Sequence, residues 1–203
     1  ISGGASFFEQ VEIKDMLSWC RVICNPYDDM ALLRVINIPR RGIGHETINY
    51  LFQQAKSIGK SLYESALNTN ITNNLMDRQK NSLGDFVVLL TKLRQFILAG
   101  KDKELADNLV DLIGYNAYIK ANTDSKVAIE IKTKNVKILT TWISDLIDGS
   151  KGDTPLNFLE AVDKLGLREM MDRRNDDQDN DAVQLMTLHA SKGLEFPFVY
   201  LVG

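Results

Sequence analysis

The segment "TLHASKGLEF" near the end of the chain brings together side chains that could bind a phosphorylated ligand. Thr187 offers a hydroxyl, His189 a ring donor and Lys192 a cation, while Gly193 leaves its backbone amide with little steric cover. Cations and open backbone amides suit phosphate. Glu195 could accept a hydrogen bond from a hydroxyl group, such as that of a ribose. Residue types and spacing alone leave an ordinary strand–turn–strand, with a solvated His and Lys, as an equal alternative.

The segment "IPRRGIGHETI" could bind an anion through its backbone. Gly42 and Gly44 flank one apolar residue, Ile43, and glycine can adopt positive φ and let the backbone approach another surface closely. The helix predicted to follow presents free N–H groups toward the same place, and such groups favour anions. Contacts of this kind would position a nucleic-acid duplex without reading its bases.

Charges of both signs flank these glycines. Arg40 and Arg41 add positive charge beside the turn, whereas Glu46 places a carboxylate near the proposed phosphate. A tight interhelical turn that needs glycine, with two surface arginines, explains the segment equally well.

Two aromatic residues near the start of the chain are the third candidate. Phe7 and Phe8 could stack on a nucleobase, although packing of both rings in a core is the favoured interpretation. Lys14 and Asp15 in the following "EIKD" are predicted to lie on a solvated helix face.

The sequence contains no complete catalytic constellation. The patterns GxxxxGK[ST], GxSxG and HExxH do not occur. Cys20 and Cys24 lie one helical turn apart with no second ligand pair, so buried free thiols are favoured over a metal site. We therefore assign no catalytic and no metal-binding residue.

Amino-acid composition is that of a globular protein and argues against several other classes. The 203 residues are 44% hydrophobic and 25% charged, an ordinary globular balance, and no apolar run approaches a membrane span. The opening residues lack the basic and apolar regions of a signal peptide. A net charge of -3 argues against a domain that binds nucleic acid over its whole surface, but allows a local basic patch.

Apolar spacing predicts that most of the chain is helical. A polar connector is expected at "NTNITNN" and a solvated loop or linker at residues 173–181. Strand-like segments occur at "ISGG", "AVQLMTLHA" and "FPFVYLVG", which predicts pieces of an α/β domain around a helical insertion. The predicted helices are Glu9–Cys24, "DDMALLRVIN" with Asp28 or Asp29 as its N-cap, His45–Ile58 ending at Gly59, 61–67, Arg78–Ala99, "KELADNLVDLIG", Lys126–Ile147, and one that begins at Thr154–Pro155 and continues through Lys164.

Two long segments resemble one known family. "VQLMTLHASKGLEFPFVYLVG" resembles motif V of the superfamily 1 DNA helicases of the UvrD/Rep/PcrA type. "ISGGASFFEQVEIKDMLSWCRVICNP" resembles the stretch of the same family that follows motif IV, with its GGxxFF and EIKD signatures. The order of these two segments and the distance between them also match the family. The resemblance covers the whole chain, and the residues in both segments are most similar to those of the Rep branch.

The resemblance implies a mainly α fold, in which a helical 2B subdomain is inserted in a RecA-like α/β domain called 2A. Residues 1–28 and 182–203 would be pieces of 2A, and residues 29–181 the 2B subdomain. "NPYDD" and residues 173–181 would be the hinge between them. The parent would be a cytoplasmic 3′-to-5′ helicase that uses ATP with Mg²⁺. Its Walker A lysine and magnesium-binding carboxylates would lie in another domain, so this chain alone should not hydrolyse ATP.

The family's residue roles carry over to both candidate segments. Thr187 and His189 would face single-stranded DNA, Lys192 and Gly193 the nucleotide phosphates, and Glu195 the ribose. The segment formed by Arg40, Arg41, Gly42, Ile43 and Gly44 would contact duplex DNA. The implied partners are a single-strand/duplex junction and the motor domains of the parent, with no membrane. The alternative is a helical protein-interaction module that does not bind DNA, which the acidic pI favours.

Overall fold

The computed structural model describes residues 7–150, 154–177, 187, 191 and 198–200. Helices make up the regular structure of these residues, and none of the described residues lies in a strand, so the predicted mainly α class is confirmed. Most of the three strand-like segments lies outside the described residues. The elements are η1 (Phe7–Glu9), α1 (Val11–Cys24), α2 (Asp29–Val35), α3 (His45–Ile58), α4 (Leu62–Leu67), α5 (Thr69–Thr72), α6 (Asp77–Leu98), α7 (Asp102–Ile113), α8 (Tyr115–Ala121), α9 (Lys126–Asp148) and α10 (Phe158–Asp177).

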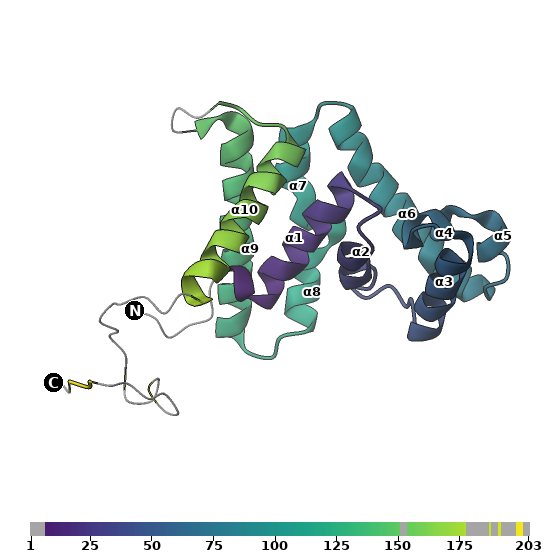
Figure 1. Ribbon diagram of the computed structural model, residues 1–203, viewed down its shortest axis with the longest axis horizontal. Helices are drawn as coiled ribbons and strands as arrows, with labels where there is room; N and C mark the ends of the chain where they lie inside the picture. Colours follow the sequence, from purple (N-terminus) through teal and green to yellow (C-terminus); the bar gives the residue numbers. More distant parts are fainter. Residues whose placement is uncertain (1–6, 151–153, 178–186, 188–190, 192–197, 201–203) are drawn as a thin grey trace.

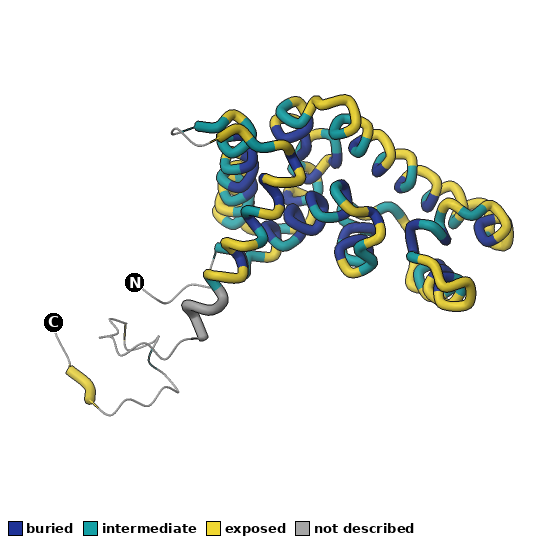
Figure 2. Tube along the Cα trace, turned by 45° about the horizontal axis from the view of Figure 1, so that its top comes forward, coloured by how far each residue is buried: buried dark blue, intermediate teal, exposed yellow. Residues whose placement is uncertain are grey.

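The helices form a larger and a smaller group joined by α6 (Figure 1). The larger group contains α1, α7, α8, α9 and α10, and the smaller contains α3, α4 and α5. The long helix α6 packs on α4 in the smaller group and on α7 in the larger. Buried residues line the inner sides of both groups (Figure 2), and they belong to one continuous core.

Helix α1 lies at the centre of this core. It contacts α2, α6, α9 and α10, and Ile13, Met16 and Trp19 on it are fully buried. The segment "NPYDD" is a turn, in which Asn25 Oδ1 accepts a hydrogen bond from the Tyr27 N–H, between two helices that pack on each other. The described residues therefore show no break in packing at the predicted boundary between residues 28 and 29.

Several helix ends follow their predicted signals. Asp28 caps α2, since its Oδ1 accepts a hydrogen bond of 3.0 Å from the Ala31 N–H. Helix α3 has the predicted bounds and ends at Gly59, whose φ of 64° is the left-handed conformation that glycine adopts readily.

The predicted bounds of the last helix are wrong at both ends. It begins at Phe158, not at Thr154–Pro155, because Asn157 caps it: Asn157 Oδ1 accepts from the Glu160 N–H, and Glu160 Oε2 accepts from the Asn157 N–H. The helix then continues through residues 173–177, which we predicted to be loop. Residues 178–181 lie outside the described residues.

Two short helices were also not predicted. Helix α5 lies in the expected polar connector, and Asn68 begins it by accepting from the Asn70 N–H. Helix α8 follows α7 directly after Gly114, whose φ of 73° redirects the chain within a single residue.

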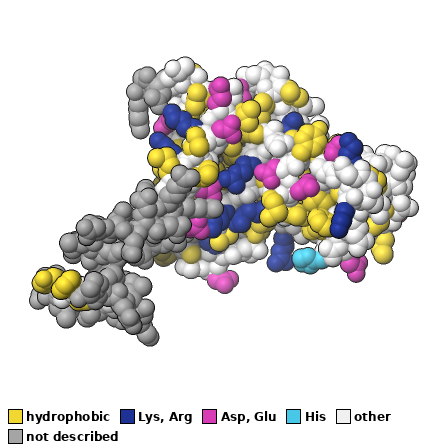
Figure 3. All heavy atoms as spheres, in the orientation of Figure 1, with side chains coloured by type: hydrophobic (Ala, Val, Ile, Leu, Met, Phe, Trp, Pro, Cys, Tyr) yellow, Lys and Arg dark blue, Asp and Glu magenta, His cyan; other side chains and the backbone are white. Residues whose placement is uncertain are grey.

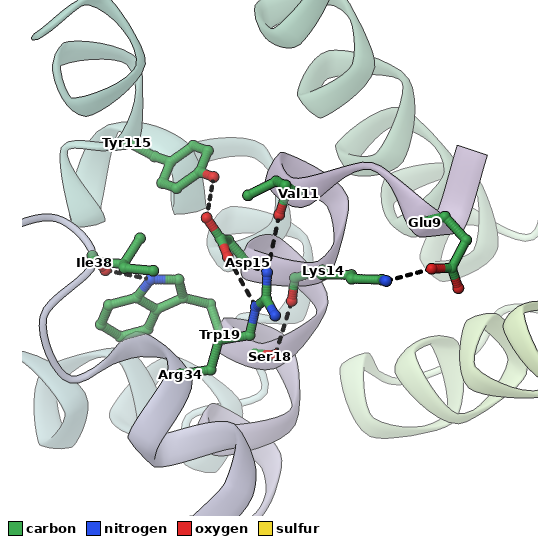
Figure 4. A network of polar contacts seen from close by, with 9 residues as sticks. All are labelled: Glu9, Val11, Lys14, Asp15, Ser18, Trp19, Arg34, Ile38 and Tyr115. Carbon is green, nitrogen blue, oxygen red and sulfur yellow. Dashed lines mark hydrogen bonds and ion pairs between the residues drawn. The ribbon is translucent and has the colours of Figure 1, made fainter. Parts of the chain in front are cut away.

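The prediction that Asp15 is solvated is wrong, because its side chain is 1% exposed within a polar network (Figure 4). Its Oδ1 accepts a 2.8 Å hydrogen bond from Arg34 Nε of α2, and its Oδ2 accepts a 2.7 Å bond from the Tyr115 hydroxyl of α8. Burial, followed by the nearby Asp15 charge, raises the pKa of Tyr115. Lys14 is more exposed than Asp15 but only partly solvated, and it pairs with Glu9.

The second carboxylate of "EIKD" is buried as well. Glu12 Oε1 accepts a 2.7 Å hydrogen bond from Asn135 Nδ2 of α9. Phe7 and Phe8 pack against Trp142 of the same helix, with ring centroids 4.9 and 6.3 Å away, as the packing interpretation predicted. Residues 7–15 are thus built into the helical body.

Candidate nucleic-acid interface

The turn between α2 and α3 is fixed by side chains at its base. Trp19 Nε1 on α1 donates a 2.9 Å hydrogen bond to the Ile38 carbonyl (Figure 4). Asn37 bridges the turn, since its Oδ1 accepts from the Arg41 N–H at 2.8 Å and its Nδ2 donates to the Ile43 carbonyl at 2.9 Å. Both halves of the turn are therefore tied to the same amide group.

The two arginines of the turn have different surroundings. Arg40 is exposed, whereas Arg41 is partly buried and donates from Nη1 to the Pro39 carbonyl at 2.8 Å. The Arg41 guanidinium lies 5.1 Å from the ring centre of Trp19 and 5.6 Å from that of Phe86. Burial lowers the pKa of Arg41 to about 10, so it remains charged at neutral pH. Arg41 holds the turn to α1 and α6, whereas the Arg40 side chain is open to solvent.

The three residues of "GIG" have different structural roles in the turn. Gly42 has a φ of 74°, which reverses the backbone in a conformation that other residues rarely adopt. Ile43 is 1% exposed and anchors the turn in the core. Gly44 has an ordinary φ of -73° and is the N-cap of α3, with open space where a Cβ would stand. Gly44 thus leaves the start of α3 uncovered.

An open cleft of about 450 Å³ lies between this turn and the start of α6. Both α3 and α6 begin at the cleft, so the positive ends of two helix dipoles and their first free N–H groups meet there. Its lining residues are Gly42, Gly44, His45, Glu46, Thr47, Met76, Arg78 and Gln79.

Thr47 gives the cleft an unpartnered polar atom. Its side chain is 1% exposed, and its Oγ1 has no hydrogen-bond partner among the described residues. Gly44 supplies no side-chain cap to α3, whereas Gln79 Oε1 reaches back to the Met76 N–H at the start of α6. The start of α3 is the less satisfied of the two helix ends, and an anion could complete it.

Charge around the cleft is mixed. Arg40, Arg78 and Lys80 are exposed basic residues, and Glu46 and Asp77 are exposed carboxylates in the first turns of α3 and α6. Figure 3 likewise shows acidic and basic side chains interspersed over the visible face. An anion would therefore be held locally by N–H groups and a few side chains, and not by a large basic field.

Little of the second predicted site lies within the described residues. Thr187 is exposed and its carbonyl accepts a 3.0 Å hydrogen bond from the Ser191 N–H. His189, Lys192, Gly193 and Glu195 lie outside the described residues, so their roles in nucleotide and single-strand binding stay predictions.

The described part of the chain contains no group of three or more His, Cys, Asp or Glu side chains that could hold a metal ion. Cys20 is fully buried, as predicted, Cys24 is half-buried, and neither forms a disulfide. Among the same residues, no helix is long and apolar enough to cross a membrane.

Comparison with known proteins agrees with the resemblance seen in the sequence. The family described as UvrD-like helicase C-terminal domain matches residues 1–203. The chain belongs to this family. It is 40% identical over 204 residues to the ATP-dependent DNA helicase Rep of Salmonella typhimurium and 39% identical to that of Escherichia coli K12. It is 28% identical over 204 residues to the ATP-dependent DNA helicase PcrA of Bacillus subtilis. Each match covers all of this chain, but only 30%, 30% and 27% of the relative.

This UvrD-like domain has residues in the turn and in the cleft that the sequence alone did not indicate. Asn37 resembles any turn asparagine in the sequence, and its bridging role depends on the folded turn. Thr47, three residues after Gly44, stands where a helix still has free N–H groups, which is a weak signal that sequence alone provides. Arg78 and Gln79 come from α6, and only the tertiary fold brings them to the turn.

Proposed function

We propose that this chain is the duplex-contacting and regulatory part of an ATP-dependent 3′-to-5′ DNA helicase. The names of its relatives support this proposal, and the chain spans about 30% of their length. The helical body would be the 2B subdomain inserted in the RecA-like 2A domain. Since α1 shares a core with α9 and α10, the packing supports a 2B subdomain that includes α1 rather than one that begins at residue 29.

The observation that carries this proposal is the cleft at which α3 and α6 both begin. Its open N–H groups and the buried Thr47 hydroxyl, together with the exposed Arg40 on the adjoining turn, suit a backbone phosphate. Such contacts ignore base identity, as a helicase requires, because it must move along any sequence. Duplex DNA would be contacted by the segment predicted from the sequence. Arg41, Gly42 and Ile43 would shape the turn. Arg40 and Gly44 would contact the phosphate.

The segment that contains Thr187 would supply part of the motor. Thr187 and His189 would contact single-stranded DNA, and Lys192, Gly193 and Glu195 would contact ATP, which the parent would bind with Mg²⁺. Catalysis would depend on positioning by domains that this chain does not contain, so the chain alone would be inactive as an ATPase. The partners would be a single-strand/duplex junction and the motor domains, in the cytoplasm.

The test is binding to a fluorescent duplex with a 3′ single-stranded tail across a salt series. Binding through phosphates weakens steeply as salt rises, because counterions are released. Gly44→Ala adds a methyl group in open space beside the free N–H groups of α3 without backbone strain, so it should weaken binding and leave the melting temperature nearly unchanged.

Two glycines with positive φ allow the effect of backbone strain on stability to be distinguished from the loss of a DNA contact. Gly42 and Gly59 have φ values of 74° and 64°, and both would be strained by alanine. Gly42→Ala should lower both stability and duplex affinity, whereas Gly59→Ala, at the far end of α3, should lower stability alone. Equal duplex affinity in the wild type, Gly42→Ala and Gly44→Ala would contradict a duplex contact at this turn.

The alternative is a helical module that binds another protein and not DNA. The net charge of -3 favours it. It predicts no salt-sensitive duplex binding, either by this chain or by a longer polypeptide that carries it, and association with a protein partner that changes little with salt.

A further inference from the structure

His45 is the first residue of α3 and lines the cleft at which α3 and α6 begin. Its side chain is exposed, and among the described residues no hydrogen bond or ion pair holds the ring. Side chains of a helix lean toward its N-terminus, because the Cα–Cβ bonds tilt in that direction. The imidazole of His45 can therefore reach a ligand held by the first N–H groups of α3.

A buried atom, in addition to the helix start, indicates that a ligand binds beside His45. Thr47 lines the same cleft, is 1% exposed, and has no partner for its Oγ1 among the described residues. Gly44 leaves open space where a side chain would cover the start of α3. The backbone N–H groups and this hydroxyl suit a phosphate, and neither changes its charge with pH. His45 would add a donor whose charge does depend on pH.

We propose that His45, when protonated, donates a hydrogen bond to the duplex phosphate bound at the start of α3. This inference rests on the proposed function, since it names a further contact of the same phosphate. A neutral imidazole has one donor, whereas an imidazolium has two donors and a positive charge, so the charged ring binds phosphate more tightly. Histidine is the side chain that ordinarily changes its charge between pH 5 and 8. Duplex binding should therefore become tighter as the pH falls.

The other charged groups around the cleft should not contribute to this pH dependence. Two carboxylates and three basic side chains line or adjoin the cleft on α3, on the turn and on α6: Glu46, Asp77, Arg40, Arg78 and Lys80. Carboxylates, lysines and arginines ordinarily keep their charge between about pH 6 and 8. Their effect on an anion is therefore constant over this range, and the charge that changes beside the phosphate is that of His45.

The test is binding of this chain to a blunt-ended fluorescent DNA duplex at about pH 6 and about pH 8, at one salt concentration. If the imidazolium binds the phosphate about tenfold more tightly than the neutral ring, the wild type should bind about fivefold more tightly at the lower pH.

Two substitutions at position 45 separate charge from shape. His45→Gln keeps a neutral donor, so it should bind equally at both pH values and with about the wild-type affinity of the higher pH. His45→Lys keeps its positive charge at both pH values, so it should bind equally at both and more tightly than the wild type at the higher pH. A purely structural role for His45 would not produce this gain. Melting temperatures should differ little among the variants, because the side chain of residue 45 is exposed.

His189→Gln is the control for the second histidine of the chain. A blunt-ended duplex offers no single strand, so this variant should keep the pH dependence of the wild type. The amino terminus also titrates near this range, but it is the same in every variant.

Three outcomes would overturn the proposal. Equal wild-type affinity at the two pH values, with binding still weakened by Gly44→Ala, would remove His45 alone and leave the duplex contact in place. A pH dependence that persists in His45→Gln would assign the titrating group to another part of the chain. Absence of salt-sensitive duplex binding at both pH values would contradict the proposed function together with this inference.

Discussion

Two neighbouring regions differ in whether their buried polar atoms have hydrogen-bond partners. Around Asp15, both carboxylate oxygens are bonded, one to Arg34 and one to Tyr115. At the cleft, Thr47 Oγ1 is buried and has no partner among the described residues, and α3 begins with no side-chain cap. Trp19 connects the two regions, because it lies on α1 with Asp15 and donates to the Ile38 carbonyl of the turn.

The difference indicates what each region is for. A buried polar group without a partner costs about 1–3 kcal/mol, so folded proteins rarely leave one unless something else completes it. The Asp15 region is complete within the protein and holds α1, α2 and α8 together. Under the proposed function, a duplex phosphate would complete the cleft.

Removing Asp15 should have the largest effect. Asp15→Ala leaves the Tyr115 hydroxyl buried without its partner and Arg34 with only partial access to water, so the free energy of unfolding should fall by about 3 kcal/mol. Urea denaturation measures the loss. Lys14→Ala removes a half-exposed ion pair one residue away and should change stability by less than about 0.5 kcal/mol. If both variants lost equal stability, the Asp15 network would not be what holds these helices.

Asn37 should have an intermediate effect on both stability and binding. Asn37→Ala removes the bonds to the Arg41 N–H and the Ile43 carbonyl, which should lower stability by about 1–2 kcal/mol and loosen the turn. Duplex affinity should fall with it, because the start of α3 is no longer held in place. Asn49→Ala, at an exposed position on α3, serves as the control and should change neither quantity. Unaltered duplex affinity in Asn37→Ala would show that a rigid turn is not needed.

The smallest effect on stability is expected at Thr47, and it should have the opposite sign. Thr47→Val replaces the unpartnered hydroxyl with a methyl group of similar shape, so stability should stay constant or rise by about 1 kcal/mol. Duplex affinity should nevertheless decrease.

Ser65→Ala is the control for Thr47→Val, because Ser65 Oγ is the other buried hydroxyl without a described partner and does not line the cleft. It should behave like Thr47→Val in thermal unfolding and leave duplex affinity unchanged. Equal duplex binding in both variants would remove Thr47 from the proposed phosphate site.

The sequence predicted the elements whose signals are local. Helix α3 was predicted with its correct bounds, since Gly59 marks its end and its apolar residues recur at helical spacing. Helix α10 was misplaced because two capping signals compete at its start, Thr154–Pro155 and Asn157, and sequence alone does not rank them.

Predictions failed where distant residues decide the outcome. Asp15 looks like a solvated carboxylate because its partner Tyr115 is 100 residues away in the sequence. The two arginines of the turn are equivalent by composition, and only the positions of Trp19 and Phe86 distinguish Arg41 from Arg40. The glycines of the cleft were found from sequence, but its second wall on α6 was not.

The central position of α1 has a consequence for biosynthesis. Arg21 on α1 pairs with Glu169 on α10, which is 148 residues later in the chain. At ribosomal rates of about 5–20 residues per second, roughly 7–30 s pass between the synthesis of these two residues. During that interval the apolar surface of α1 that faces α10 lacks its cover. The nascent chain is therefore most exposed to aggregation and to chaperones before α10 leaves the ribosome, and products truncated within α9 should be degraded rather than accumulate.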